Sequence, residues 1–192
     1  SALIVAKARG SFTEKDKFKI DQYVMRGGKV LWMIDRMRAD LDSLLGRREY
    51  LAVEYSEDNF NLEDLLFRYG VRMEPNLLLD MRNSKIQLAV GKVGNSAQFE
   101  KFAYPYHPIL VPKNDHPIVK SLGPVNVFYP STIDTAVRTK TAVDKTVLLE
   151  TSEYTRYQLT PVALDFNFLR YPLDPKKFNQ KPQPVAVLME GI

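Results

Sequence analysis

The first 34 residues show a strand, a helix and a second strand in their pattern of apolar and polar positions. Residues 2–6, ALIVA, form an apolar run of strand length. A helical pattern follows, with apolar positions at i, i+3, i+4 and i+7: Ile20, Tyr23, Val24 and Gly27. Residues 30–34, VLWMI, are apolar throughout, which is typical of a strand covered on both faces. This order predicts a βαβ unit with two parallel strands, in which Trp32 is largely buried.

Capping and stop residues mark the ends of this first helix. Ser11 and Glu14 form a capping box, and Thr13 offers an alternative N-cap. Gly27 and Gly28 end the helix, because glycine adopts a left-handed conformation without steric cost. The helix is therefore expected to occupy most of residues 11–26.

A second well-marked helix is predicted at residues 61–69. Asn61 is its expected N-cap, Asp64 stands at the capping-box position, and Gly70 follows as a stop. A short helix is expected at 38–45, carrying leucines on one side.

The chain changes character after residue 83. Short β-like runs then alternate with glycine and proline, and most of the twelve prolines lie there. We therefore expect an α/β part at 1–83 and a β-rich, proline-rich part at 84–192, packed together as one domain.

Composition and charge narrow the classes of function. The 192 residues are 45% hydrophobic and 26% charged, as expected of a globular protein, and include no cysteine. The absence of cysteine excludes disulfides, thiolate metal sites and cysteine nucleophiles. The net charge of +4 comes from scattered basic residues, which argues against a nucleic-acid partner. No phosphate-binding loop or G-x-S-x-G elbow occurs, and neither a cofactor nor a metal is expected.

Asp35 is the first candidate site residue. It directly follows the apolar run VLWMI, and ligands of open α/β sheets gather at the carboxyl ends of strands. It could bind a ligand there, or it could cap the next helix or make an Asx turn, and the second interpretation is favoured.

The segment FAYPYHPI at 102–109 supplies the other candidates: Tyr104, Tyr106 and His107. These side chains form either an aromatic recognition surface for a peptide or sugar, or an irregular edge of the core. The spacing of His107 and His116 matches no usual metal-ligand pattern.

Long stretches of the chain resemble a known family. ALIVAKARGSFTEKDKFKIDQYVMRGGKVLWMID, NLEDLLFRYGVRMEPNLLLD, HPIVKSLGPVNVFYPSTID and KTVLLETSEYTR are similar to the gliding-motility-associated ABC transporter component family, GldG, of the Bacteroidetes. The family is usually labelled a substrate-binding or auxiliary subunit, and it offers no catalytic residues to transfer.

The resemblance implies a fold and a location. The fold would be α/β, a flavodoxin-like sandwich related to class I glutamine amidotransferases. The parent protein would be anchored in the inner membrane, with this region on the periplasmic side. An apolar run starts at Ala2 and another, PVAVLMEGI, stops at the last residue, so we expect a fragment of a longer protein. The resemblance implies that a strand and a helix upstream of Ala2 are missing. The open edge of the first strand would then favour self-association.

These observations predict a non-enzymatic domain of an ABC-transporter-associated protein. It would act by contacting the membrane and ATPase subunits of the transporter or other cell-envelope proteins. Two alternatives remain open at this stage: a small-ligand or glycan-binding module at the strand ends, and a degenerate amidotransferase-like hydrolase.

Overall fold

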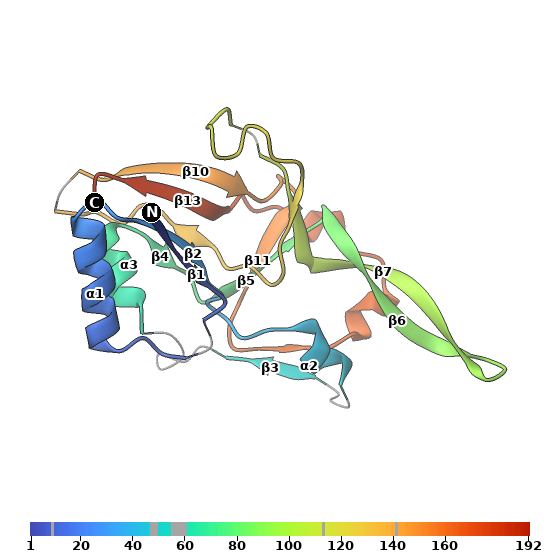
Figure 1. Cartoon of the computed structure of the whole chain (residues 1–192). Helices are drawn as coiled ribbons and strands as arrows, with labels where there is room; N and C mark the ends of the chain where they lie inside the picture. The colour runs from blue at the N-terminus through green and yellow to red at the C-terminus, as the bar shows by residue number, and fades with distance from the viewer. Residues whose placement is uncertain (9, 47–49, 55–60, 113, 141) are drawn as a thin grey trace.

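The computed structural model describes residues 1–8, 10–46, 50–54, 61–112, 114–140 and 142–192 of the chain. Figure 1 shows a molecule built mainly of strands, with two helices side by side at one end. Strands make up 40% and helices 17%, so β-structure dominates.

The predicted parallel pair is confirmed. Strands β1 (Ala2–Ala6) and β2 (Lys29–Met33) run parallel in register, and helix α1 (Glu14–Met25) connects them. The N-cap of α1 is Thr13, whose side chain accepts a hydrogen bond from the backbone N–H of Asp16, so the alternative cap is the one used.

Helix α3 (Glu63–Tyr69) lies beside α1 and begins two residues after Asn61. Gly70 ends α3 with φ of +103°, as predicted for a glycine stop. The buried residues of α3 form a cluster with Val71, against which side chains of α1, β2 and the C-terminal strand pack. The smaller of two cores is thus assembled around these helices.

The predicted flavodoxin-like sandwich is wrong. Within the described residues, the strands form small separate sheets, and β1–β2 is the one parallel pair. Strands β3 (Leu51–Val53) and β5 (Asn76–Asp80) pair antiparallel with β12 (Val162–Leu164) and β11 (Thr155–Leu159). That fold was expected from the family resemblance and fits the first βαβ unit, whereas the later strands pair with antiparallel partners far along the chain.

The other elements complete this arrangement. They are α2 (Leu41–Leu45), β4 (Arg72–Met73), β6 (Asn83–Val93), β7 (Ser96–Leu110), β8 (Val125–Asn126), β9 (Ile133–Asp134), β10 (Asp144–Glu150), β13 (Pro184–Glu190) and the 3-10 turns η2 (Asn167–Arg170) and η3 (Pro175–Lys177). Strand β4 pairs with β9, β10 with β13, and β7 with both β6 and β8.

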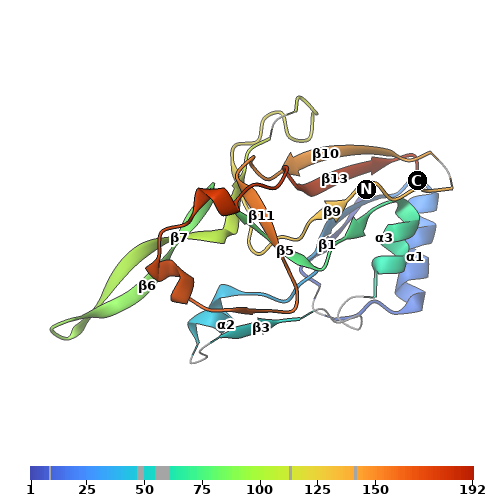
Figure 2. The ribbon, with the colours of Figure 1, turned by 180° about the vertical axis from the view of Figure 1, so that it is seen from behind.

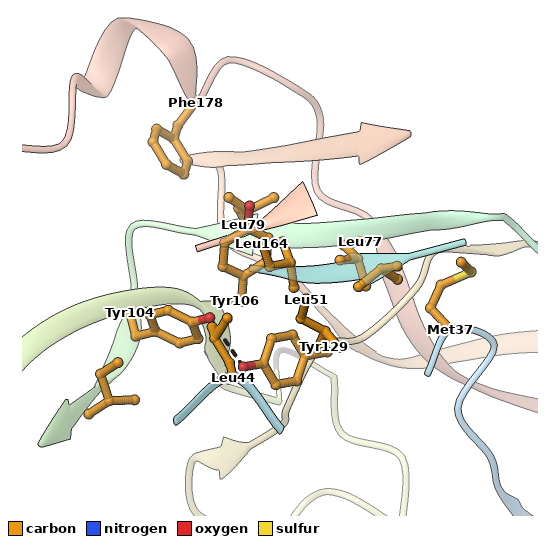
Figure 3. Close-up of a cluster of buried hydrophobic side chains, with 12 residues drawn as sticks. Met37, Leu44, Leu51, Leu77, Leu79, Tyr104, Tyr106, Tyr129, Leu164 and Phe178 are labelled. Atoms are coloured by element: carbon orange, nitrogen blue, oxygen red, sulfur yellow. Dashed lines mark hydrogen bonds between the residues drawn. The ribbon is translucent and has the colours of Figure 1, made fainter. Parts of the chain in front are cut away.

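The larger core joins the two expected parts of the chain. Leucines of α2, β3 and β5 pack there with the tyrosines of β7 and with Leu164 and Phe178, as Figure 3 shows. Residues from before and after position 83 therefore share one apolar interior.

The β6–β7 hairpin projects from the body, at the end opposite α1 and α3 in both Figure 1 and Figure 2. Ile86 at its base is buried, whereas residues 89–101 are exposed wherever their side chains are described.

Candidate functional site

One face of the β1–β2 sheet is apolar and uncovered. Side chains of paired residues in a parallel sheet point to the same face, so Ile4 lies beside Leu31 and Ala6 beside Met33. The exposed fractions are 62% for Ile4, 51% for Leu31 and 50% for Met33. We call this surface, made by Ala2, Ile4, Ala6, Leu31 and Met33, the outer face.

The opposite face of the same sheet is covered by helices. Trp32 and Ile34 are partly buried there and pack against the cluster of α3, and Phe12 meets the Trp32 ring edge-on at 6.1 Å. The run VLWMI predicted coverage of both faces, and this prediction is wrong for Leu31 and Met33. In the described residues a helical layer exists on one side alone.

Charged residues stand at the two ends of the outer face. Lys29 begins β2 and shares the side of Leu31 and Met33, while Asp35 follows two residues after Met33. Lys7 lies near Asp35, because its backbone N–H donates to the carbonyl of Met33 at 2.8 Å. The outer face therefore runs from a cation at the start of β2 to a carboxylate at its end, and Lys7 lies near that carboxylate.

Among the described residues, Asp35 has no hydrogen-bond partner that would explain its position at the end of β2. Helix α2 is capped by Asp40, whose side chain accepts from the N–H of Ser43, so Asp35 is not the helix cap that was favoured. Within the described chain its carboxyl makes no hydrogen bond. Partial burial raises the pKa of this carboxyl, and the nearby Lys7 opposes that rise.

The aromatic candidates of β7 lie in the core. Tyr104, Tyr106 and His107 are all buried, which fits the alternative of a core edge. Tyr104 and Tyr129 share a hydroxyl–hydroxyl hydrogen bond of 3.1 Å, drawn in Figure 3. The Tyr106 hydroxyl donates to Gln158 Oε1 at 2.6 Å. Asp35 lies outside this cluster, so the four candidates form no common site.

His107 is enclosed by aromatic rings. Tyr104, Phe128 and Tyr129 each meet its imidazole edge-on, at 4.6 to 5.0 Å between ring centroids. Its Nε2 has no hydrogen-bond partner among the described residues, and burial lowers the pKa of His107 to about 4. Such an imidazole is neutral at physiological pH and is held away from solvent.

A second carboxylate, Asp80, also lies at a strand end and was not among the predicted site residues. It is fully buried at the end of β5, where its oxygens accept hydrogen bonds from Ser152 N and Oγ and from Arg82 N at 2.6 to 2.7 Å. The local signal was an apolar run, LLL at 77–79, followed by an aspartate, which resembles the signal that singled out Asp35. Asp80 joins segments 72 residues apart and has a structural role.

A small cavity opens beside the base of the hairpin. Its volume is about 240 Å³, and its walls include Phe102 of β7 and the segment 168–173. The described residues contain no group of three or more His, Asp or Glu that could hold a metal ion. None of the described helices combines the length and the apolar character needed to cross a membrane.

Comparisons with known proteins place the chain in a wider group. A family model described as an ABC-type uncharacterized transport system matches residues 1–192. No curated protein matches the chain significantly. Among solved structures, the chain is similar to one titled mmIFT52 N-terminal domain, with 15% identity and a TM-score of 0.48. That similarity covers 95% of this chain and 64% of the other.

Proposed function

Because the chain belongs to the ABC-type uncharacterized transport system family, we propose that it is a non-enzymatic component that works by binding other proteins of such a system. The partners are the membrane and ATPase subunits of the transporter or other proteins of the cell envelope. The family accounts for the association with transport, and the surface of the molecule supports the mode of action.

The observation that carries this proposal is the uncovered outer face. Parallel strands are normally covered on both sides, because their side chains are apolar in both directions. Here Ile4, Leu31 and Met33 are half-exposed or more, side by side on one sheet. Exposed apolar patches of this kind mark contact sites for other macromolecules.

The arrangement of polar side chains gives little support to catalysis. A general base needs to reach both a substrate and the proton that it removes. His107 is enclosed by aromatic rings, and the sequence offers no cysteine for amidotransferase chemistry. The flavodoxin-like fold that suggested a degenerate hydrolase is not the one observed, so that alternative loses its basis.

The sequence resemblance extends the proposal to a gliding-motility type of transporter component. We infer that this domain works on the periplasmic side of the inner membrane, where transporter subunits and envelope proteins are both accessible. Exposure to added protease in spheroplasts, but not in intact cells, would test this location.

A second candidate function rests on the cavity beside the hairpin. Phe102, Phe168 and Tyr171 contribute to its walls together with Arg170, and aromatic walls suit a sugar or a peptide side chain. Its volume of about 240 Å³ is below the range of about 300–1,000 Å³ that is common for ligand sites. We therefore rank a glycan-binding role below protein contact.

Co-purification from native membranes tests the proposed function. The full-length protein, tagged, should recover the ATPase and membrane subunits of an ABC transporter, identified by mass spectrometry. A Leu31→Ser, Met33→Ser variant should lose these subunits, because polar side chains weaken an apolar contact. Phe18→Ser is the matched control, since Phe18 is 64% exposed on α1, away from the outer face. Recovery without transporter subunits, or equal recovery by all three proteins, would contradict the proposal.

A further inference from the structure

The outer face has the size of one helix. Strands of five residues are about 17 Å long, and two of them present a face about 10 Å wide. A helix has a diameter of about 10 Å, and about 11 of its residues span 17 Å. The apolar part of the outer face therefore matches three helical turns.

The same dimensions argue against a second copy as the occupant. A standard protein–protein interface buries about 800 Å² per partner. Two flat five-residue strands supply about half of that at most. A dimer formed through the outer face alone would thus be weak. A single helix, by contrast, covers an area no larger than the outer face.

The charges at the two ends give the helix a direction. The N-terminus of a helix carries a partial positive charge and free N–H groups, and its C-terminus carries a partial negative charge. Asp35, whose carboxyl makes no hydrogen bond within the described chain, would accept from the N-terminal amides. Lys29 would lie at the C-terminal end. Helix α1 runs antiparallel to β1 and β2 as it covers the other face, and this orientation repeats that geometry.

We propose that the outer face binds an amphipathic α-helix of a partner protein, which lies antiparallel to β1 and β2 with its N-terminus at Asp35 and its C-terminus at Lys29. This inference rests on the proposed function and names the structural element that the partner supplies. The helix carries leucine-like residues on one face and an acidic residue in its last turn. It completes the second layer that the apolar pattern of VLWMI predicts.

Two synthetic peptides test the proposal with the 192-residue chain. Both carry one leucine stripe over 12 residues and are held helical by a hydrocarbon staple on the polar face. The matched peptide has lysine in its first turn and glutamate in its last turn, and the reversed peptide has these two residues exchanged. Binding is measured by fluorescence anisotropy. The matched peptide should bind about fivefold more tightly, because its lysine faces Asp35 and its glutamate faces Lys29 in two exposed ion pairs.

Variants of the chain locate the binding and its orientation. Leu31→Ser, Met33→Ser should remove saturable binding of both peptides, whereas Phe18→Ser should not. Asp35→Asn should reduce the preference for the matched peptide, and Asp174→Asn, on the exposed turn η3, should leave it unchanged. Circular dichroism checks that each variant is folded.

Several results would overturn this inference without touching the proposed function. These are the absence of peptide binding, an equal affinity for both peptides, or binding that survives the Leu31→Ser, Met33→Ser change. Sedimentation that shows a dimer of the chain, lost in that variant, would assign the outer face to a second copy instead. The co-purification experiment does not depend on the occupant being a helix, so its failure is separate.

Discussion

His107 links the stability of the protein to pH. The folded protein holds it neutral with a pKa of about 4, whereas an unfolded chain protonates it near pH 6.5. Between these values the unfolded state binds more protons, so the free energy of unfolding falls as the pH is lowered. The loss from this group approaches about 3 kcal/mol by pH 4.

His107→Phe should remove this part of the pH dependence, because phenylalanine does not titrate. It also removes Nε2, which has no hydrogen-bond partner among the described residues, from among the aromatic rings. Urea denaturation at pH 4.5 and 7.5 measures the effect, and His116→Gln, at the other histidine of the chain, is the control. An unchanged pH dependence in His107→Phe would contradict the burial of a neutral imidazole.

Asp80 is expected to be the most sensitive carboxylate in the chain. Asp80→Ala leaves the N–H groups of Ser152 and Arg82 without their buried acceptor, at a cost of about 3 kcal/mol or more. Ser152→Ala should cost about 1 kcal/mol, since one hydroxyl donor is lost. Chemical denaturation compares both variants with Asp115→Ala at an exposed position. Similar stabilities of the Asp80→Ala and Asp115→Ala variants would show that the hydrogen bonds of Asp80 to Ser152 and Arg82 do not stabilise the fold.

At the scale of elements, Lys17 of helix α1 forms an ion pair with Asp64 of helix α3. Its side chain is buried, and Nζ lies 3.0 Å from Asp64 Oδ1 and 3.2 Å from Asn61 Oδ1. Lys17→Ala removes this link together with the packing of the aliphatic stem, so we expect a loss of about 2 kcal/mol. Lys15→Ala, exposed on the same helix, should change the midpoint of thermal unfolding little. Equal effects of the two changes would rule out the link.

The glycines that end α1 and α3 differ in their surroundings. Gly27 and Gly70 both have a left-handed φ, at +83° and +103°, so alanine is strained at either position. A Cβ at Gly70 would lie 2.8 Å from Lys145 Cε and 2.9 Å from Thr139 Cγ2, whereas one at Gly27 meets nothing within 4 Å.

Gly27→Ala should therefore cost about 1 kcal/mol, from backbone strain. Gly70→Ala should cost about 1 kcal/mol more, since neighbours of α3 have to move. Urea midpoints of the two variants give the comparison. Equal losses of stability in the two variants would mean that the close packing at the end of α3 does not contribute to the free energy of unfolding.

At the scale of the whole molecule, a packed body carries a projecting hairpin (Figures 1 and 2). Two-stranded hairpins are marginally stable alone, and residues 89–101 lack buried contacts among the described side chains. Strand β5 is buried at every position, so it serves as the reference for the packed body in a comparison with the hairpin.

Hydrogen exchange should separate the hairpin from the body. Amides of residues 89–101 should exchange with opening free energies of about 0–2 kcal/mol, and those of β5 with values close to global unfolding. Replacing residues 89–99 by an Asn-Gly turn should leave global stability almost unchanged, because Leu88 and Glu100 already face each other. Protection of the hairpin equal to that of β5 would contradict this division.

The sequence by itself determined those elements whose formation depends on residues close together in the sequence. The parallel pair β1–β2 with its helix, the stop at Gly70 and the strand-like character of residues 84–110 all follow from local patterns. Such patterns identify an element but not its partner in a sheet. The flavodoxin-like fold, which the family resemblance implied, was wrong because the later strands find antiparallel partners that no local pattern indicates.

The tertiary structure alone decided which distant segments meet and which apolar residues stay exposed. Pairing of β5 with β11 and of Asp80 with Ser152 joins residues more than 70 positions apart, with no local signal. Asp35 and Asp80 have the same setting in the sequence, yet Asp80 is fully buried and hydrogen-bonded whereas Asp35 stays accessible to solvent. An apolar strand indicates that its side chains favour burial, but it does not indicate which residues bury them. Burial depends on the segments that pack against the strand. Which layer supplies it, and whether it belongs to this chain, depends on contacts that periodicity does not encode.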